Sequence, residues 1–443
     1  MKIERIKHRQ AAWIISAILL SGGLITFPRE LVRISGKDAW TCFVLPFMFA
    51  FLIIYLYTRM MKYKPGKHIF SIVTDSFGTI IGNGINLILI LYFWMLLSRD
   101  ITSLSFFLNS TILTETPREM IIWLLGPVLL YYGKLGFEPV ARVNDFSLPF
   151  MVVMLIFLPL LVSNEIKPEL LMPTFTGDPH ALLYGNVANL GWVGDLFVIG
   201  SFLHKLQDGA KTRVYLRIGT VVGMALLVMG IFLNLCVMGP NITGRVLYPY
   251  HVMVEQIQIT DFMDRLETLI YVLWFPVYFV NTAVFAIALF VGFSHLAKNV
   301  HYRQFSGVTS WLIVITSVFA YNSIIELTNF INYSLTFIVL FVITPIIVIT
   351  LLRLMWMNKN SSQAKPNSPR KPYNIWTYVS HGLVFLFAVI VIIGQTFALD
   401  MPTVGTVGMI AVALVILGLV VCTFLEWYRY MQEEKHSPSH DKN

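Results

Sequence analysis

Twelve long hydrophobic runs, separated by short polar segments, cover most of the chain. They span residues 9–35, 38–61, 83–112, 118–133, 138–162, 181–206, 211–238, 265–298, 306–328, 330–357, 373–398 and 404–427. A helix that crosses a membrane needs about 20 mostly apolar residues. The pattern therefore predicts an all-α polytopic membrane protein with twelve spans.

Basic residues are divided unevenly between the two sets of loops that alternate along this predicted bundle. With the N-terminus inside, 24 Lys and Arg residues lie in the inner segments and 7 lie in the outer ones. Cytoplasmic loops of membrane proteins are enriched in Lys and Arg. The division therefore predicts that both termini are cytoplasmic.

The composition narrows the class of protein further. Hydrophobic residues make up 56% of the chain and charged residues 13%, and the mean hydropathy is +0.71. A soluble domain carries about 25% charged residues, so these values exclude a soluble globular enzyme and a disordered chain. The net charge of +8 does not indicate nucleic-acid binding, because the basic residues sit in short gaps between apolar runs. No metal-binding spacing and no phosphate-binding glycine loop is found, so we expect no metal, no cofactor and no enzymatic activity.

A change in composition divides the chain after the tenth run. Residues 1–357 form the predicted ten-helix core. Residues 358–372 are polar and basic, which is typical of a flexible cytoplasmic linker. Residues 373–431 hold two additional predicted transmembrane helices, and residues 432–443 are predicted to be a disordered tail.

Two of the predicted helices carry helix-breaking residues near their centres. The first contains Ser21, Gly22 and Gly23, and the sixth contains Gly191, Gly194 and Asp195. Glycine destabilises a helix interior by about 1 kcal/mol relative to alanine. Two interrupted helices at corresponding positions, five spans apart, indicate an inverted-repeat transporter fold in which helices 1–5 and 6–10 are the two copies.

The breaks also suggest a binding site. A break exposes backbone N–H and C=O groups at the middle of the membrane, where little else can satisfy them. We expect Gly22 and Gly23 to present N–H groups to a carboxylate, and Gly191 and Gly194 to free carbonyls that hold an ammonium group. A small zwitterion such as an amino acid matches both. The alternative is that the glycines only allow close helix packing.

Several sequence stretches resemble one family. They are GGLITFPRELV in helix 1, TETPREMI after helix 3, GFEPVARVNDF entering helix 5, MPTFTGDPHALLYG before helix 6 and, as the most specific, residues 248–275 entering helix 8. Over roughly residues 5–357 the chain is similar to the permease-like B subunit of spore germination nutrient receptors, in the amino acid–polyamine–organocation transporter superfamily. The resemblance implies a five-plus-five inverted-repeat (LeuT-like) fold in which helices 1, 3, 6 and 8 line a midplane cavity. The family usually ends after the tenth helix, so residues 358–443 depart from it.

Three charged residues fall inside predicted spans. Arg99 and Asp100 lie halfway along helix 3, and Asp195 lies in the break of helix 6. A charge at mid-membrane is costly and normally faces a cavity or a partner. We consider all three as gating or proton-path candidates, with a structural ion pair as the alternative for Arg99 and Asp100. Asp195 could bind substrate, carry a proton or cap the inner half-helix.

Aromatic residues on helices 3 and 8 complete the candidate site. Helix 8 carries Tyr271, Trp274, Tyr278 and Asn281 on one face, and Tyr92 lies on helix 3. An aromatic stripe can also be plain packing. The predicted substrate-binding set is Ser21, Gly22, Gly23, Tyr92, Gly191, Gly194, Asp195, Trp274 and Tyr278.

These observations lead to one expectation for function and two alternatives. Through the resemblance, we expect a membrane subunit of a germinant receptor in the spore inner membrane. It would bind a small nutrient, an amino acid, and signal to a large membrane subunit and a lipoprotein. The first alternative is a proton-coupled amino acid transporter, and the second is a scaffold with a vestigial pocket.

Overall fold

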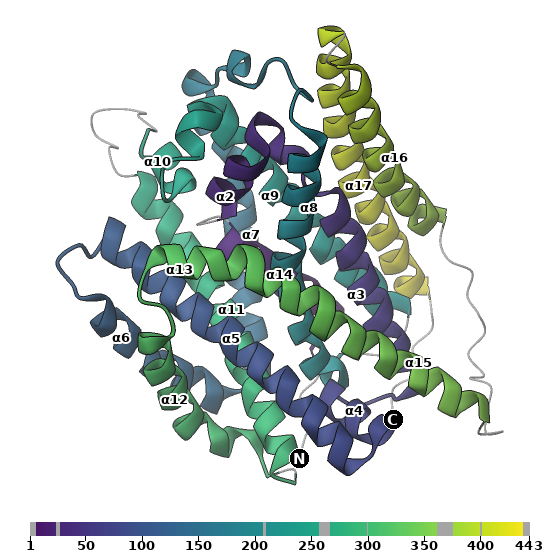
Figure 1. The fold of residues 1–443 in the computed structure, drawn as a ribbon. Coiled ribbons are helices and arrows are strands. Elements are labelled where there is room, and N and C mark those ends of the chain that lie inside the picture. The colour runs from purple at the N-terminus through teal and green to yellow at the C-terminus, as the bar shows by residue number, and fades with distance from the viewer. Residues whose placement is uncertain are drawn as a thin grey trace.

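The computed structural model describes residues 6–23, 27–206, 210–256, 266–298, 300–360, 375–398 and 401–436, and all regular structure within these ranges is helical (Figure 1). The elements of the first half are α1 (His8–Gly23), α2 (Phe27–Ser35), η1 (Gly36–Thr41), α3 (Val44–Tyr63), α4 (Ile69–Phe77), α5 (Thr79–Thr111), α6 (Arg118–Leu135), α7 (Phe137–Leu161), η2 (Ser163–Glu165) and η3 (Pro168–Leu171).

The second half begins with predicted helix 6, which comprises α8 and η4. Its elements are α8 (Pro179–Val193), η4 (Gly194–Lys205), α9 (Ala210–Thr243), α10 (Pro249–Glu255), α11 (Leu266–Leu296), η5 (Tyr302–Phe305), α12 (Ser306–Ala320), α13 (Ile324–Asn329), η6 (Phe330–Ser334), α14 (Leu335–Ile338), η7 (Val339–Ile343), α15 (Thr344–Asn360), α16 (Ile375–Phe397) and α17 (Pro402–His436). Predicted helices 3, 8 and 9 correspond to α5, α11 and α12, and helix 10 runs from α13 to α15.

The described residues contain 9 helices that are long and apolar enough to cross a membrane, or up to 10 if the bent α1–α2 pair is one span. The other two predicted spans are shorter or more polar. The helix α6 has 18 residues and three charged side chains, and α12 has 15 residues. The chain is a multi-pass membrane protein, and the count of twelve spans stays a prediction. The cytoplasmic location of both termini also stays a prediction. Residues 1–5 and 437–443 lie outside the described ranges.

The predicted break in helix 1 is confirmed. The helix α1 ends at Gly23, and the following helical segment, which begins at Phe27, is inclined to it by 68°. The second predicted break takes a different form. At Gly194 the α-helix changes into a 3-10 helix of 12 residues. Because 3-10 runs longer than three or four residues are uncommon, this segment marks a local departure from regular helix geometry.

Helix 10 packs closely against helix 6 at Gly191 and Gly194. It contains two π-helical segments, η6 and η7, and its side chains lie directly over Gly191 and Gly194. A Cβ atom on Gly191 would lie 2.9 Å from the backbone nitrogen of Thr336, and one on Gly194 would lie 2.3 Å from Cγ2 of Val339. Close helix packing therefore requires glycine at both positions.

The final pair, α16 and α17, packs against α9 and α3 along one edge of the bundle (Figure 1). The buried Arg217 of α9 pairs with the buried Glu426 of α17, with Nη1 and Oε2 separated by 3.7 Å. Glu426 also accepts a hydrogen bond from Thr377, and Arg217 donates one to Ser380. An ion pair inside the protein thus joins the pair to the repeat core.

The boundaries predicted around this pair are shifted by a few residues. The helix α15 continues to Asn360, so residues 358–360 are helical rather than linker. The helix α17 continues to His436, so residues 432–436 are not a disordered tail. The extension of α17, residues 432–436, contains good helix formers beyond the apolar run, and helix propensity does not depend on hydropathy. The remaining residues of the linker and the tail, 361–372 and 437–443, lie outside the described ranges.

Candidate functional site

The three charged residues predicted inside spans meet in one buried cluster. The Arg99 guanidinium donates from Nη1 and Nη2 to the two carboxylate oxygens of Asp195, at 3.0 and 2.7 Å. It also donates from Nε and Nη2 to Oδ1 of Asp100, at 2.9 and 2.7 Å. Each of the three residues is at most 3% exposed. This arrangement, hereafter the triad, links helix 3 to helix 6 by a bidentate ion pair.

The geometry excludes one of the three alternatives for Asp195, the helix cap. The residue before the 3-10 segment, Val193, occupies the capping position and makes no side-chain capping bond. Asp195 lies in the first turn, and its carboxylate pairs with Arg99 instead. Its role is therefore an ion pair between helices rather than a helix cap.

Helix 8 contributes the face predicted from its spacing. Asn281 donates from Nδ2 to Oδ2 of Asp100 at 3.0 Å, and the Tyr278 hydroxyl donates to the Asp100 carbonyl at 2.6 Å. One turn away, the Trp274 indole donates to the Ser21 carbonyl at 2.8 Å. Trp274, Tyr278 and Asn281 therefore link helix 8 to helix 3 and to the end of α1 by hydrogen bonds, in addition to packing.

The end of α1 is covered by a residue that the sequence analysis missed, Trp192. A Cβ atom on Gly22 would lie 2.5 Å from its ring, and one on Gly23 would lie 3.3 Å from Nε1. The Trp192 indole donates to the Leu19 carbonyl at 3.3 Å, and its ring lies 5.0 Å from the Arg99 guanidinium. The sequence signal was a large aromatic residue between Gly191 and Gly194.

The expectation that Gly22 and Gly23 present N–H groups to a ligand is wrong. Both residues lie at the C-terminal end of α1, and that end of a helix exposes carbonyl groups, whereas N–H groups are exposed at the N-terminus. The carbonyls of Leu19 and Ser21 accept bonds from the two tryptophan indoles. The helix dipole is negative there, so this end favours a cation rather than a carboxylate.

Two buried oxygen atoms beside the triad lack hydrogen-bond partners among the described residues. They are the Tyr92 hydroxyl and Oδ1 of Asn281. The Tyr92 hydroxyl lies 3.0 Å from the position that a Cβ on Gly194 would take, next to Asp195. Buried polar atoms normally find a partner. These two are available to a ligand that reaches the triad.

The C-terminal end of α5 is covered by aromatic side chains. The Phe107 ring contacts Tyr248, His251, Tyr271 and Trp274, with ring centres 5.1 to 5.9 Å apart. A cavity of about 40 Å³ lies among these rings and α7. That volume is far below the size of a small-molecule pocket, so this side of the triad is closed in the present arrangement.

The triad has an imbalance of formal charge. Two carboxylates share one guanidinium, which leaves one negative charge in excess when both are ionised. An uncompensated charge away from water is strongly unfavourable. The cluster can therefore take up one proton or the cationic group of a ligand. In the described residues, no group of three or more His, Cys, Asp or Glu side chains is placed to hold a metal ion.

Solved structures with the same architecture are transporters. One is MHP1, a nucleobase-cation-symport-1 family transporter in a closed conformation with bromovinylhydantoin bound, at a TM-score of 0.57 and 13% identity over 95% of this chain and 94% of that chain. Another is a Na⁺-coupled sialic acid symporter in a substrate-bound outward-open state, at a TM-score of 0.52 and 10% identity over 95% and 90%. The predicted inverted-repeat transporter fold is confirmed. At 95% coverage the likeness extends into α16 and α17.

Sequence relatives identify the family. A family model described as "Spore germination protein" matches residues 5–331. The chain is 26% identical over 312 residues to the putative spore germination protein YfkT of Bacillus subtilis (strain 168), which covers 70% of this chain and 86% of that protein. It is 22% identical over 322 residues to spore germination protein KB of the same organism, covering 72% and 86%. The chain therefore belongs to the spore germination protein family of permease-like membrane proteins, which are receptor- or transporter-like rather than enzymes.

Proposed function

We propose that this chain is the membrane subunit of a germinant receptor in the spore inner membrane, with both ends in the cytoplasm. It binds a small nutrient, an amino acid, at the triad and signals to partner subunits. The observation that carries the proposal is the bidentate pair between Arg99 and Asp195. This pair joins helix 3 to helix 6 beside the break in helix 1, and helix 8 supplies Asn281 and Tyr278 to the same cluster.

An amino acid carries both a carboxylate and an ammonium group, so it can supply a new partner to Arg99 and a new partner to Asp195. Its carboxylate can replace Asp195 on the Arg99 guanidinium, because a guanidinium binds carboxylates in a bidentate manner. Its ammonium group can pair with the released Asp195 and with the carbonyl end of α1, which favours a cation. Each charged group keeps an oppositely charged neighbour and the single excess negative charge of the triad is unchanged, while the direct link between helix 3 and helix 6 is removed.

The exchange provides a physical route to a signal. A ligand shifts a conformational equilibrium only when it binds one state better than the other. A ligand that replaces the Arg99–Asp195 pair binds the state in which the two helices are separated. Partner subunits in contact with these helices would detect the change. The partners expected are a large membrane subunit and a lipoprotein, as the family resemblance implies.

One observation favours a second function, a proton-coupled amino acid transporter. The triad carries one negative charge in excess, and a proton on Asp100 or Asp195 would neutralise it. A proton that binds and leaves with the ligand would couple uptake to the pH gradient. Uptake of a labelled amino acid into proteoliposomes that rises with an imposed pH gradient supports this function, and binding without flux supports the receptor.

The receptor is tested by the nutrient dose–response of spores that carry variants of this chain at matched membrane levels. We expect Asp195→Asn to raise the nutrient concentration for half-maximal germination about tenfold, because a charge-assisted hydrogen bond is lost. Glu169→Gln, a change of the same kind in the short helix η3, serves as the control and should leave the response within about twofold. An unchanged response in Asp195→Asn would contradict a role of the triad in nutrient recognition.

A further inference from the structure

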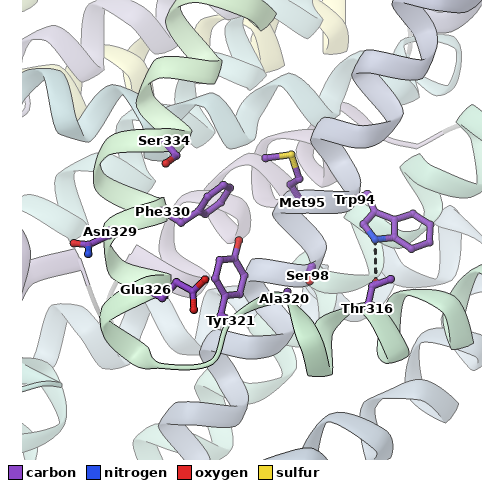
Figure 2. A pocket seen from close by; sticks show the side chains of 10 residues that line it. All are labelled: Trp94, Met95, Ser98, Thr316, Ala320, Tyr321, Glu326, Asn329, Phe330 and Ser334. Carbon is purple, nitrogen blue, oxygen red and sulfur yellow. Dashed lines mark hydrogen bonds between the residues drawn. The ribbon is translucent and has the colours of Figure 1, made fainter.

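A second cavity lies outside the triad. It has a volume of about 630 Å³ and is lined by residues of α5, α12, α13 and η6 (Figure 2). Small-molecule sites typically occupy about 300–1,000 Å³. The cavity is therefore large enough for a small organic molecule, and no part of the proposed nutrient site accounts for it.

The lining combines one acid with aromatic and apolar side chains. Glu326 and Tyr321 lie next to each other in the cavity, with Phe330 and Met95 nearby (Figure 2). The rings of Tyr321 and Phe330 are 5.5 Å apart and inclined by 53°. No Lys or Arg is among the lining residues, and the nearby Arg118 guanidinium donates to the backbone carbonyls of Tyr321 and Val318.

The position of Glu326 is fixed by its local structure. Its backbone N–H donates to the Ser323 hydroxyl at 3.2 Å, and its Oε2 accepts from the backbone N–H of Asn322 at 3.0 Å. This arrangement resembles a capping box at the start of α13, with the return bond made to the residue before the N-cap, Ser323. The carboxylate is thereby held at the cavity without a basic partner among the residues that line it, and one of its two oxygens remains for a ligand.

We propose that this cavity binds a small primary amine with an apolar body, as a site separate from the nutrient site. The ammonium group pairs with Glu326 and lies against the rings of Tyr321 and Phe330, since aromatic faces attract cations. The apolar body contacts Met95 and Ala320. An amine is favoured over an amino acid because the lining offers a carboxylate no basic side chain.

The site is mechanically connected to helix 6 through helix 10. Phe330 and Ser334 are the first and last residues of the π-helical segment η6, and π-helical turns occur frequently at functional sites. Directly after this segment, Thr336 lies on Gly191, and its hydroxyl donates to the Ala188 carbonyl at 3.1 Å. An amine that moves the η6 wall thus acts on the helix that carries Asp195.

The proposal is tested with purified full-length protein in phosphatidylglycerol nanodiscs, whose headgroups carry no amine. Three probes of equal chain length are compared: hexylamine, hexanoate and hexanol. The thermal unfolding midpoint, followed by tryptophan fluorescence, is measured against probe concentration. We expect a saturable rise with hexylamine and none with hexanoate or hexanol. A second set in phosphatidylethanolamine nanodiscs asks whether the lipid ammonium occupies the same site, in which case it displaces hexylamine.

Variants locate the binding. Glu326→Gln removes the charge but keeps the cap, since Gln also serves in a capping box, and it should weaken hexylamine binding about tenfold. Glu169→Gln should bind hexylamine as the wild type does. Equal shifts by hexylamine and hexanol, a rise that never saturates, or unchanged binding in Glu326→Gln would each overturn the proposal. None of these outcomes depends on whether the triad binds a nutrient.

Discussion

At the scale of single residues, the sequence predicted the polar members of the site but not their contacts. Arg99, Asp100 and Asp195 were identifiable because charges inside a membrane need partners. Their bidentate geometry depends on where helix 3 crosses helix 6, and no local spacing encodes that crossing. Trp192 was missed because one aromatic residue between glycines has no distinctive pattern. The expectation that Gly22 and Gly23 present N–H groups was wrong because the two glycines end a helix rather than begin one, and their positions in the sequence do not show which.

The first prediction separates the roles of the triad members in stability. Arg99→Met leaves two carboxylates buried without their cation and should lower the free energy of unfolding by about 3–5 kcal/mol. Asp195→Asn keeps a hydrogen-bond acceptor and removes the excess negative charge, so its cost should be smaller. Unfolding of both variants in detergent measures the difference. Equal losses would show that the charge balance of the triad is not what stabilises it.

The second prediction concerns a histidine outside the membrane-spanning segments. The ring of His68 lies 5.3 Å from those of His204 and His295, and Lys67, next to it in the chain, pairs with Asp75. Burial, together with these two histidines and Lys67, lowers the pKa of His68 to about 3. The ordinary pKa of a histidine is about 6.5. At a pH below that value, the unfolded chain therefore binds a proton on His68 that the folded chain does not bind.

Stability should accordingly fall as the pH decreases from about 6.5 toward 3, because the unfolded state binds more protons in that interval. His68 also caps α4 by accepting from the Ser71 N–H at 3.3 Å. His68→Asn keeps a good capping residue and removes the titration, so it should flatten the pH dependence of the unfolding midpoint. An unchanged slope would assign the acid sensitivity to other groups.

At the scale of elements, the sequence located both irregular helices but not the form of each irregularity. Helix 1 bends where Gly22 and Gly23 predict a break. Helix 6 changes into a long 3-10 segment at Gly194, where helix 10 packs against it, and that contact comes from a distant part of the chain. The π-helical segments η6 and η7 were not predicted, because Phe330–Ser334 and Val339–Ile343 read as ordinary apolar helix.

The third prediction tests this contact between helices. Gly191→Ala places a Cβ 2.9 Å from the Thr336 backbone, which cannot move like a side chain, and should lower stability by about 1–3 kcal/mol. Gly84→Ala, at an exposed position of α5 with no atom of another segment within 4 Å, should be neutral or stabilise by up to about 1 kcal/mol. Thermal unfolding of the matched pair decides the matter. If both variants behave alike, helix 10 does not pack on helix 6 as described.

At the scale of the whole molecule, the repeat was predictable because apolar runs and helix breaks are local signals. The family was predictable through the resemblance of short stretches such as residues 248–275. The attachment of α16 and α17 was not, since a polar linker precedes them and the buried pair Arg217–Glu426 spans two distant helices. Each of these residues resembles an ordinary charge near a membrane boundary when taken alone. Only the fold shows that they meet.

The fourth prediction tests this attachment. Glu426→Met removes the acid partner of the buried Arg217 and should cost about 3–5 kcal/mol, whereas Arg217→Met combined with Glu426→Met should recover much of the loss. The exposed pair Arg142–Glu138 provides the control, and Glu138→Gln should cost less than about 1 kcal/mol. A double variant that is no more stable than Glu426→Met would mean that the two charges do not interact.

The most direct test of the account is the binding of labelled amino acids to the purified protein in nanodiscs, compared between the wild type, Asp195→Asn and Glu169→Gln. Replacement of the Arg99–Asp195 pair by a zwitterion predicts that at least one amino acid binds the wild type and Glu169→Gln equally, and binds Asp195→Asn about tenfold more weakly. An amino acid that binds all three proteins with the same affinity would contradict nutrient recognition at the triad.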